Sequence, residues 1–170
     1  MTDRFRLALA QINPHEGALD VNADRIRAAR AEAAGMGADL VVTPEFSIAG
    51  YPPEDLVLKP AFVAACTQRI EALAAETADG GPGLVVGGPW VEGGRLHNAL
   101  FVLEGGRIIA RRAKHELPNY GVFDDKRVFT EGPAPGPVMF RGVRLGLMIC
   151  EDWWFPSVSE TLQESGAELL

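Results

Sequence analysis

The sequence predicts an α/β fold, and three observations support this prediction. Short apolar runs, typical of buried strands, alternate with alanine-rich helical segments through the first 86 residues. Farther along the chain, glycine-containing turns at residues 105–106 and 141–142 separate extended segments and predict two hairpins. Hydrophobic residues make up 47% and charged residues 23% of the 170, which suits one folded domain.

In the first half, the pattern predicts three strands alternating with two helices, at residues 5–12, 21–34, 40–42, 60–77 and 84–86. The first strand is apolar at nearly every position, so we expect it to be covered on both faces. Asp20 is the expected N-cap of the first helix, and Gly87 and Gly88 are expected to close the third strand. Cys66 falls on the apolar stripe of the second helix, which predicts a core position.

In the second half, we expect a hairpin at residues 98–103 and 107–113, and another around residues 141–142. The return strand of the second hairpin is predicted to run through residues 143–149 to Cys150, and a helix is predicted from Pro156 to about Ser165. The basic run at 107–114 is typical of a solvated strand face. Residues 167–170 resemble the start of another buried strand, so we expect the chain to be a fragment.

Composition excludes several classes of function. The net charge of −7 argues against binding to a nucleic-acid backbone, which needs clustered Lys and Arg. No apolar run approaches the length of a membrane helix, and the start lacks a signal peptide's apolar middle, so we expect no membrane partner and a cytoplasmic location. Two distant cysteines, together with the scattered His15, His97 and His115, predict neither a disulfide scaffold nor a metal site.

Three reactive side chains each follow a predicted strand: Glu45, Lys114 and Cys150. Strand ends are where sites collect in α/β folds, and an acid, a cation and a thiol at one edge would form a nucleophilic site. The carboxylate would take the thiol proton, while the ammonium and backbone N–H groups would stabilise an oxyanion. Taken singly, each residue has an ordinary alternative, since Glu45 and Lys114 would suit the surface and Cys150 a structural position.

Four motifs resemble the carbon–nitrogen hydrolase (nitrilase) superfamily, in the family's order. They are residues 10–14 (AQINP), 43–56 (TPEFSIAGYPPEDL), 114–127 (KHELPNYGVFDDKR) and 146–154 (GLMICEDWW). The second and third are most similar to the glutaminase domains of glutamine-dependent NAD synthetases. The resemblance extends through nearly the whole chain, so we expect residues 1–170 to form a truncated domain of this family.

The resemblance implies an α-β-β-α four-layer sandwich, incomplete at its C-terminus, with a Glu–Lys–Cys triad. Carried over by position, Glu45 is the general base, Lys114 stabilises the transition state and Cys150 is the nucleophile. Tyr120 and Glu151 match positions that bind the substrate glutamine. For Glu151, a role in ordering the turn after Cys150 is the alternative.

The implied activity is hydrolysis of the glutamine side-chain amide through a cysteine thioester, which supplies ammonia for ATP-dependent amidation of deamido-NAD. The synthetase signature Ser-Gly-Gly-x-Asp-Ser does not occur here, so the synthetase domain, with its ATP and Mg²⁺, is expected outside this chain. No cofactor is expected within the chain, and a homo-oligomer is expected. The truncated domain alone should be weakly active or inactive. The alternatives are a free-standing amidase acting on another small amide, and a non-catalytic interaction module.

Overall fold

Five strands form one sheet in the order β1-β2-β3-β4-β5, and two more form a second sheet, β6-β7. The structure is a computed structural model and describes residues 4–170. The chain divides into two units, which are described separately. Unit 1 comprises Met1–Pro89 and Phe101–Arg111, and unit 2 comprises Trp90–Leu100 and Arg112–Leu170.

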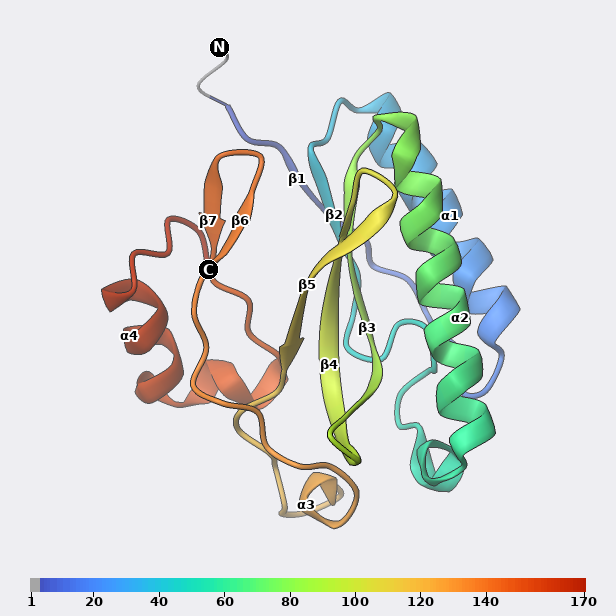
Figure 1. The fold of residues 1–170 in the computed structure, drawn as a ribbon, viewed down its shortest axis with the longest axis vertical. Coiled ribbons are helices and arrows are strands. Elements are labelled where there is room, and N and C mark those ends of the chain that lie inside the picture. Colours follow the sequence, from blue (N-terminus) through green and yellow to red (C-terminus); the bar gives the residue numbers. More distant parts are fainter. Residues whose placement is uncertain (1–3) are drawn as a thin grey trace. The chain divides into compact units, whose positions relative to one another are not determined.

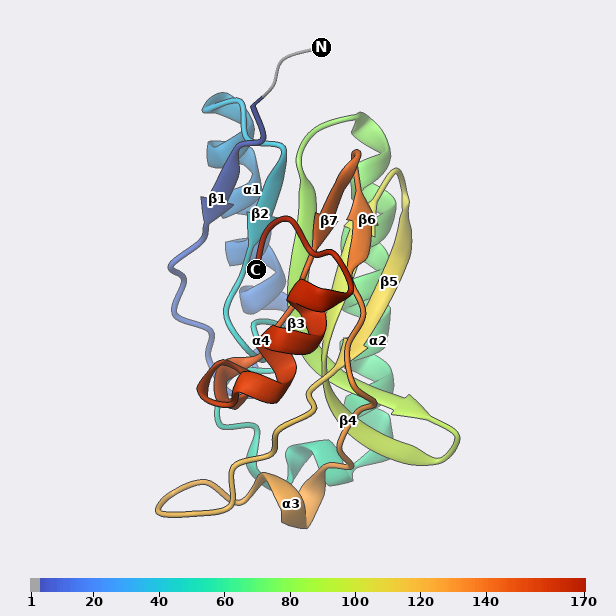
Figure 2. The same ribbon diagram turned by 90° about the vertical axis from the view of Figure 1, so that its left-hand side faces the viewer.

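Unit 1 begins with three parallel strands. β1 (Leu7–Leu9) pairs with β2 (Leu40–Val42), and β2 pairs with the start of β3 (Gly83–Glu92). Figure 2 shows β1 beside β2 at the edge of the sheet. The helices α1 (Leu19–Gly35) and α2 (Pro60–Glu76) connect these strands and lie side by side along the sheet (Figure 1). The predicted alternation of strands and helices is therefore confirmed.

The core of unit 1 lies between the helices and the strands, and Cys66 is part of it. Cys66, Ile26 and Ile70 have no exposed surface, and Leu73 is only 1% exposed. Burial raises the pKa of the Cys66 thiol to about 12, because a thiolate would lose its hydration there. The prediction of Cys66 as a core residue is confirmed.

Three expectations for the first half are wrong. The first strand has three residues rather than eight, and it is not covered on both faces, since Leu7 and Leu9, which lie on the same face, are exposed. Asp20 is not an N-cap, since α1 already begins at Leu19 and the Asp20 carboxylate accepts a hydrogen bond from Arg69 at 2.9 Å. The glycines at 87–88 do not end the third strand, which continues to Glu92.

Two glycine turns connect the longer strands. β3 turns through Gly93 and Gly94 into β4 (Arg95–Glu104), and β4 turns through Gly105 and Gly106 into β5 (Arg107–Ala113). All four glycines have positive φ, as two-residue hairpin turns with primed geometry require. The sequence predicted the second of these hairpins and missed the first.

Unit 2 contains the small sheet and two helices. β6 (Val138–Phe140) and β7 (Val143–Leu145) form the predicted antiparallel hairpin, and α4 (Pro156–Glu164) follows as predicted. α3 (Asp125–Val128) was not expected. Three short 3-10 helices complete the described elements. Unit 1 contains Glu54–Leu58 and Thr77–Asp79, and unit 2 contains Cys150–Trp154.

The return strand of the β6–β7 hairpin is shorter than predicted. It ends at Leu145; beyond it, Gly146 N–H donates to the Leu169 carbonyl, Arg112 donates to the Leu147 carbonyl, and Ile149 N–H donates to Asp152. Leu169 forms one parallel bridge with Leu145 but stays 36% exposed, so the expected buried strand at residues 167–170 is limited to this bridge.

No helix within residues 4–170 combines the length and apolar character needed to cross a membrane.

Candidate active site

Glu45 lies in unit 1, in the turn that directly follows β2. Its neighbours fix the turn against β3: the Thr43 hydroxyl donates to the Val85 carbonyl at 2.8 Å, and Gly87 N–H donates to the Ser47 hydroxyl at 3.0 Å. A Cβ atom at Gly87 would lie 2.5 Å from the backbone nitrogen of Phe46. This close approach explains the glycine within β3, and it holds the half-buried Glu45 at the strand end.

Lys114 lies in unit 2, directly after β5, and its backbone is held on both sides. Its N–H donates to the Asn98 carbonyl at 2.8 Å, and its carbonyl accepts from Gly132 N–H at 2.7 Å. The side chain is 1% exposed, and Nζ lies 2.9 Å from Oδ2 of Asp125 at the start of α3. Because burial of an ammonium group costs hydration free energy, the negative charge of Asp125 offsets part of the cost of burying Lys114.

Cys150 begins the 3-10 helix Cys150–Trp154 and is exposed. Its φ is +46°, in the left-handed region, which costs a side-chain-bearing residue roughly 1–3 kcal/mol. The flanking residues enforce this turn: Ile149 N–H donates to the Asp152 carboxylate, and Asp152 N–H donates to the Ile149 carbonyl, each at 3.0 Å. Cys150 is thus exposed at the start of a 3-10 helix that hydrogen bonds on either side of it stabilise.

Tyr120 and Glu151 contact each other in unit 2. The Tyr120 hydroxyl lies 3.0 and 2.9 Å from the two oxygens of the Glu151 carboxylate. Tyr120 is 57% exposed, whereas Glu151 is 7% exposed. The pKa of the Tyr120 hydroxyl is raised, first because its hydrogen bond to Glu151 favours the protonated phenol, then by burial and by the charges of Glu151 and Cys150. The charge of Lys114 opposes this rise.

Four of the five predicted site residues therefore come together in unit 2. Tyr120 contacts Glu151, which follows Cys150 directly, and the Asp152 carboxylate binds the backbone N–H groups of His115, next to Lys114, and Ile149, next to Cys150. Glu45 belongs to unit 1, and its proximity to the other site residues stays a prediction. Among residues 4–170, no group of three or more His, Cys, Asp or Glu side chains is arranged to hold a metal ion.

Three charged residues of this neighbourhood were missed from the sequence. Asp125 pairs with Lys114, and Asp152 is fully buried, with the Arg112 guanidinium 3.3 Å from its carboxylate. Arg112 is 6% exposed, so the expected solvated face of the basic run is wrong at this position. Burial lowers the pKa of Arg112, opposed by the charge of Asp152. The position of Asp152 two residues after the candidate nucleophile was the one available signal.

An α/β protein that presents an exposed cysteine on a strained turn, near a buried lysine and carboxylates, has the features of a nucleophilic enzyme. Comparison with known proteins identifies the class. The carbon–nitrogen hydrolase family model matches residues 6–170, so the chain belongs to the carbon–nitrogen hydrolase family.

Individual relatives agree with this assignment. The chain is 48% identical over 170 residues to the glutamine-dependent NAD(+) synthetase of Rhodobacter capsulatus. The aligned region comprises 100% of this chain and 31% of that relative. The structure of the glutamine-dependent NAD+ synthetase from Acinetobacter baumannii matches with a TM-score of 0.89 and 35% identity, covering 98% of this chain and 32% of that one. The chain therefore spans about a third of these relatives.

A smaller enzyme has the same fold. An amidase of the nitrilase superfamily from Nesterenkonia sp. AN1 matches with a TM-score of 0.83 and 28% identity, covering 97% of this chain and 63% of the amidase. One structure of that amidase shows covalent addition of the acetamide moiety of fluoroacetamide at its active-site cysteine. These similarities confirm the predicted fold class, an α/β fold of the nitrilase type.

Proposed function

We propose that this chain is a glutaminase domain, which hydrolyses the side-chain amide of glutamine and releases ammonia. The observation that carries the proposal is the exposed Cys150 on its left-handed turn, whose neighbour Ile149 binds the same Asp152 carboxylate as His115 and Glu116, which follow the buried Lys114. The names of the relatives that match along the whole chain, glutamine-dependent NAD(+) synthetases, support glutamine as the substrate.

The first half-reaction forms a thioester. Glu45 accepts the Cys150 thiol proton, and the thiolate attacks the amide carbon of glutamine. The Lys114 ammonium and backbone N–H groups after Cys150 stabilise the resulting oxyanion. When the carbon–nitrogen bond breaks, Glu45 returns the proton to the leaving nitrogen, and ammonia departs.

The second half-reaction releases glutamate. Water gives a proton to Glu45 as it attacks the thioester carbon, and the carbon–sulfur bond then breaks, with the proton returning to Cys150. Glu151 is the partner proposed for the substrate's α-ammonium group. Since its carboxylate is occupied by the Tyr120 hydroxyl in this structure, the substrate's ammonium would share or displace that hydrogen bond.

The ammonia would be used by a synthetase domain beyond this chain, to amidate deamido-NAD with ATP and Mg²⁺. The one-third coverage of the relatives supports this arrangement. The cytoplasmic location, the homo-oligomer and the low activity of the isolated domain stay predictions.

The test is Cys150→Ala in the full-length protein. We expect loss of glutamine hydrolysis and of glutamine-dependent NAD synthesis, with ammonia-dependent synthesis retained. Labelling of wild-type Cys150 by a glutamine-like diazoketone is the complementary measurement. Loss of both synthetic activities would indicate a structural role for Cys150, and absence of an adduct would favour a non-catalytic module.

A free-standing amidase acting on another small amide is the second candidate, and the similarity to the Nesterenkonia amidase favours it. Steady-state rates with glutamine and a panel of short aliphatic amides separate the two functions. Efficient turnover of aliphatic amides, without turnover of glutamine, would replace the glutaminase proposal.

A further inference from the structure

Asp152 connects the two segments that carry the candidate nucleophile and the candidate oxyanion-stabilising lysine. Its carboxylate is completely buried, although Trp153 and Trp154, the next two residues, are exposed. One oxygen, Oδ1, accepts N–H bonds from His115 at 3.1 Å and Glu116 at 2.8 Å, which directly follow Lys114. The other, Oδ2, accepts from Ile149 N–H at 3.0 Å, directly before Cys150.

The fourth donor to this carboxylate is the guanidinium of Arg112, 3.3 Å from Oδ2. Arg112 lies two residues before Lys114 and also donates to the carbonyls of Ala113 and Leu147. The donors to Asp152 therefore come from both sides of Lys114 and from the residue before Cys150. Each segment is held through its backbone, which leaves little freedom for the two to move apart.

We propose that Asp152 is a positioning residue, which fixes the Cys150 thiol relative to the Lys114 ammonium by binding backbone donors from both segments. The proposal rests on the proposed function, in which these two groups share one reaction centre. Asp152 itself touches no reacting atom. It acts through the left-handed turn at Cys150 and through the strand end at Lys114.

A simple charge effect makes the opposite prediction for the thiol. If Asp152 acted only as a nearby negative charge, its removal would favour the thiolate and lower the pH midpoint of Cys150 alkylation. If Asp152 acts by positioning, its removal loosens the approach of the Lys114 ammonium, so that the thiolate loses stabilisation and the midpoint rises. The sign of the change therefore distinguishes the two roles.

The primary variant is Asp152→Asn in the full-length protein. An amide of the same shape has one acceptor oxygen, so either the donors after Lys114 or those on Oδ2 would face an NH₂ group. We expect kcat for glutamine hydrolysis to fall about 10- to 100-fold with KM nearly unchanged, since small misplacements of reacting groups have effects of that size. The midpoint of iodoacetamide alkylation at Cys150 should rise by about one pH unit.

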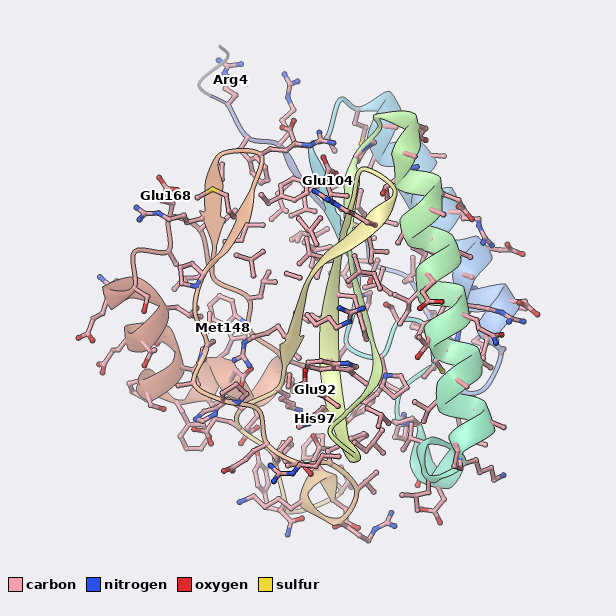
Figure 3. All side chains as sticks on the ribbon, in the orientation of Figure 1. Arg4, Glu92, His97, Glu104, Met148 and Glu168 are labelled. Atoms are coloured by element: carbon pink, nitrogen blue, oxygen red, sulfur yellow. The ribbon has the colours of Figure 1, made fainter. Side chains whose placement is uncertain are left out.

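Glu168→Gln is the matched control. The Glu168 carboxylate also accepts a backbone N–H, that of Arg144 at 2.8 Å, and lies 3.6 Å from the same arginine's guanidinium. It is near the β6–β7 hairpin (Figure 3) and bonds to neither the Lys114 nor the Cys150 segment. We expect kcat and the alkylation midpoint to equal those of the wild type.

Asp152→Glu covers the case in which Asp152→Asn does not fold. It keeps the negative charge but displaces the carboxylate by one methylene group, so positioning predicts at least a roughly tenfold loss of kcat, whereas a charge effect predicts none. A folded variant with wild-type kcat, a change confined to KM, or a lowered midpoint in Asp152→Asn would overturn the proposal.

The alkylation measurement keeps this proposal separate from the proposed function, because it needs no substrate. If the wild-type protein fails to hydrolyse glutamine, the glutaminase proposal is wrong, and the midpoints of wild type and Asp152→Asn still decide the role of Asp152.

Discussion

Replacing Asp125 by Asn should break the buried ion pair that Asp125 forms with the Lys114 ammonium. The two side chains are 1% and 10% exposed, and their charged atoms lie 2.9 Å apart. Breaking a buried ion pair by removing one partner costs about 3–5 kcal/mol. For a domain of this size, each kcal/mol lowers the melting temperature by roughly 2–4 °C, so we expect a fall of roughly 6–20 °C.

Asp124→Asn, one residue earlier, is the matched control. Asp124 pairs with Arg127 at 2.5 Å, but both side chains are about half exposed, at 56% and 49%. Exposed pairs contribute about 0–1 kcal/mol, so its melting temperature should stay within a few degrees of the wild type. Scanning calorimetry on the full-length proteins, read at the unfolding transition of this domain, measures both values.

A double variant extends the test. Lys114→Met with Asp125→Leu removes both charges, and replacing a buried pair by apolar residues is often neutral or stabilising. We therefore expect the double variant to melt at a higher temperature than Asp125→Asn while lacking glutaminase activity. A melting temperature for Asp125→Asn equal to that of Asp124→Asn would refute the argument that Asp125 compensates a buried charge.

Three further predictions concern other parts of the chain. Gly87→Ala should destabilise the protein by about 1–3 kcal/mol and impair glutamine hydrolysis, because the new Cβ would displace the backbone of the Glu45 turn; wild-type melting and kcat would contradict this. Glu151→Gln should raise KM for glutamine about 10- to 100-fold, as expected for loss of a charged hydrogen bond; a KM equal to wild type would remove Glu151 from the binding site. In native protein at pH 7–9, iodoacetamide should modify Cys150 but not the buried Cys66, whose pKa is about 12; mass spectrometry before and after denaturation checks this.

Local features of the fold were accessible from the sequence because they depend on neighbouring residues. The hairpin turns at residues 105–106 and 141–142 have positive φ throughout, and glycine at these turns was visible in the sequence. The end of α1 near Gly35 and Gly37, the start of α2 at Pro60 and the core position of Cys66 followed from the same short-range patterns.

Elements whose limits depend on distant partners were predicted less well. Glycines 87–88 were expected to end a strand, yet β3 continues through them, because their missing side chains admit the Glu45 turn and the side chains of Ile48 and Ile70. The return strand β7, by contrast, ends at Leu145 instead of continuing to residue 149, and Arg112 and Asp152 bond to backbone groups beyond its end. Neither set of contacts can be recognised from the sequence close to the strand, because most of the partner residues lie far along the chain.

The sequence by itself determined the family, the alternation of helices and strands, and the candidate residues Glu45, Lys114, Cys150, Tyr120 and Glu151. Only the tertiary structure decided that Asp125 rather than Asp124 pairs with Lys114, and that Asp152 holds segments about 36 residues apart. The physical reason is that the energy of a charge depends on its burial and its partners. Both are set by contacts between residues far apart along the chain, which no local pattern records.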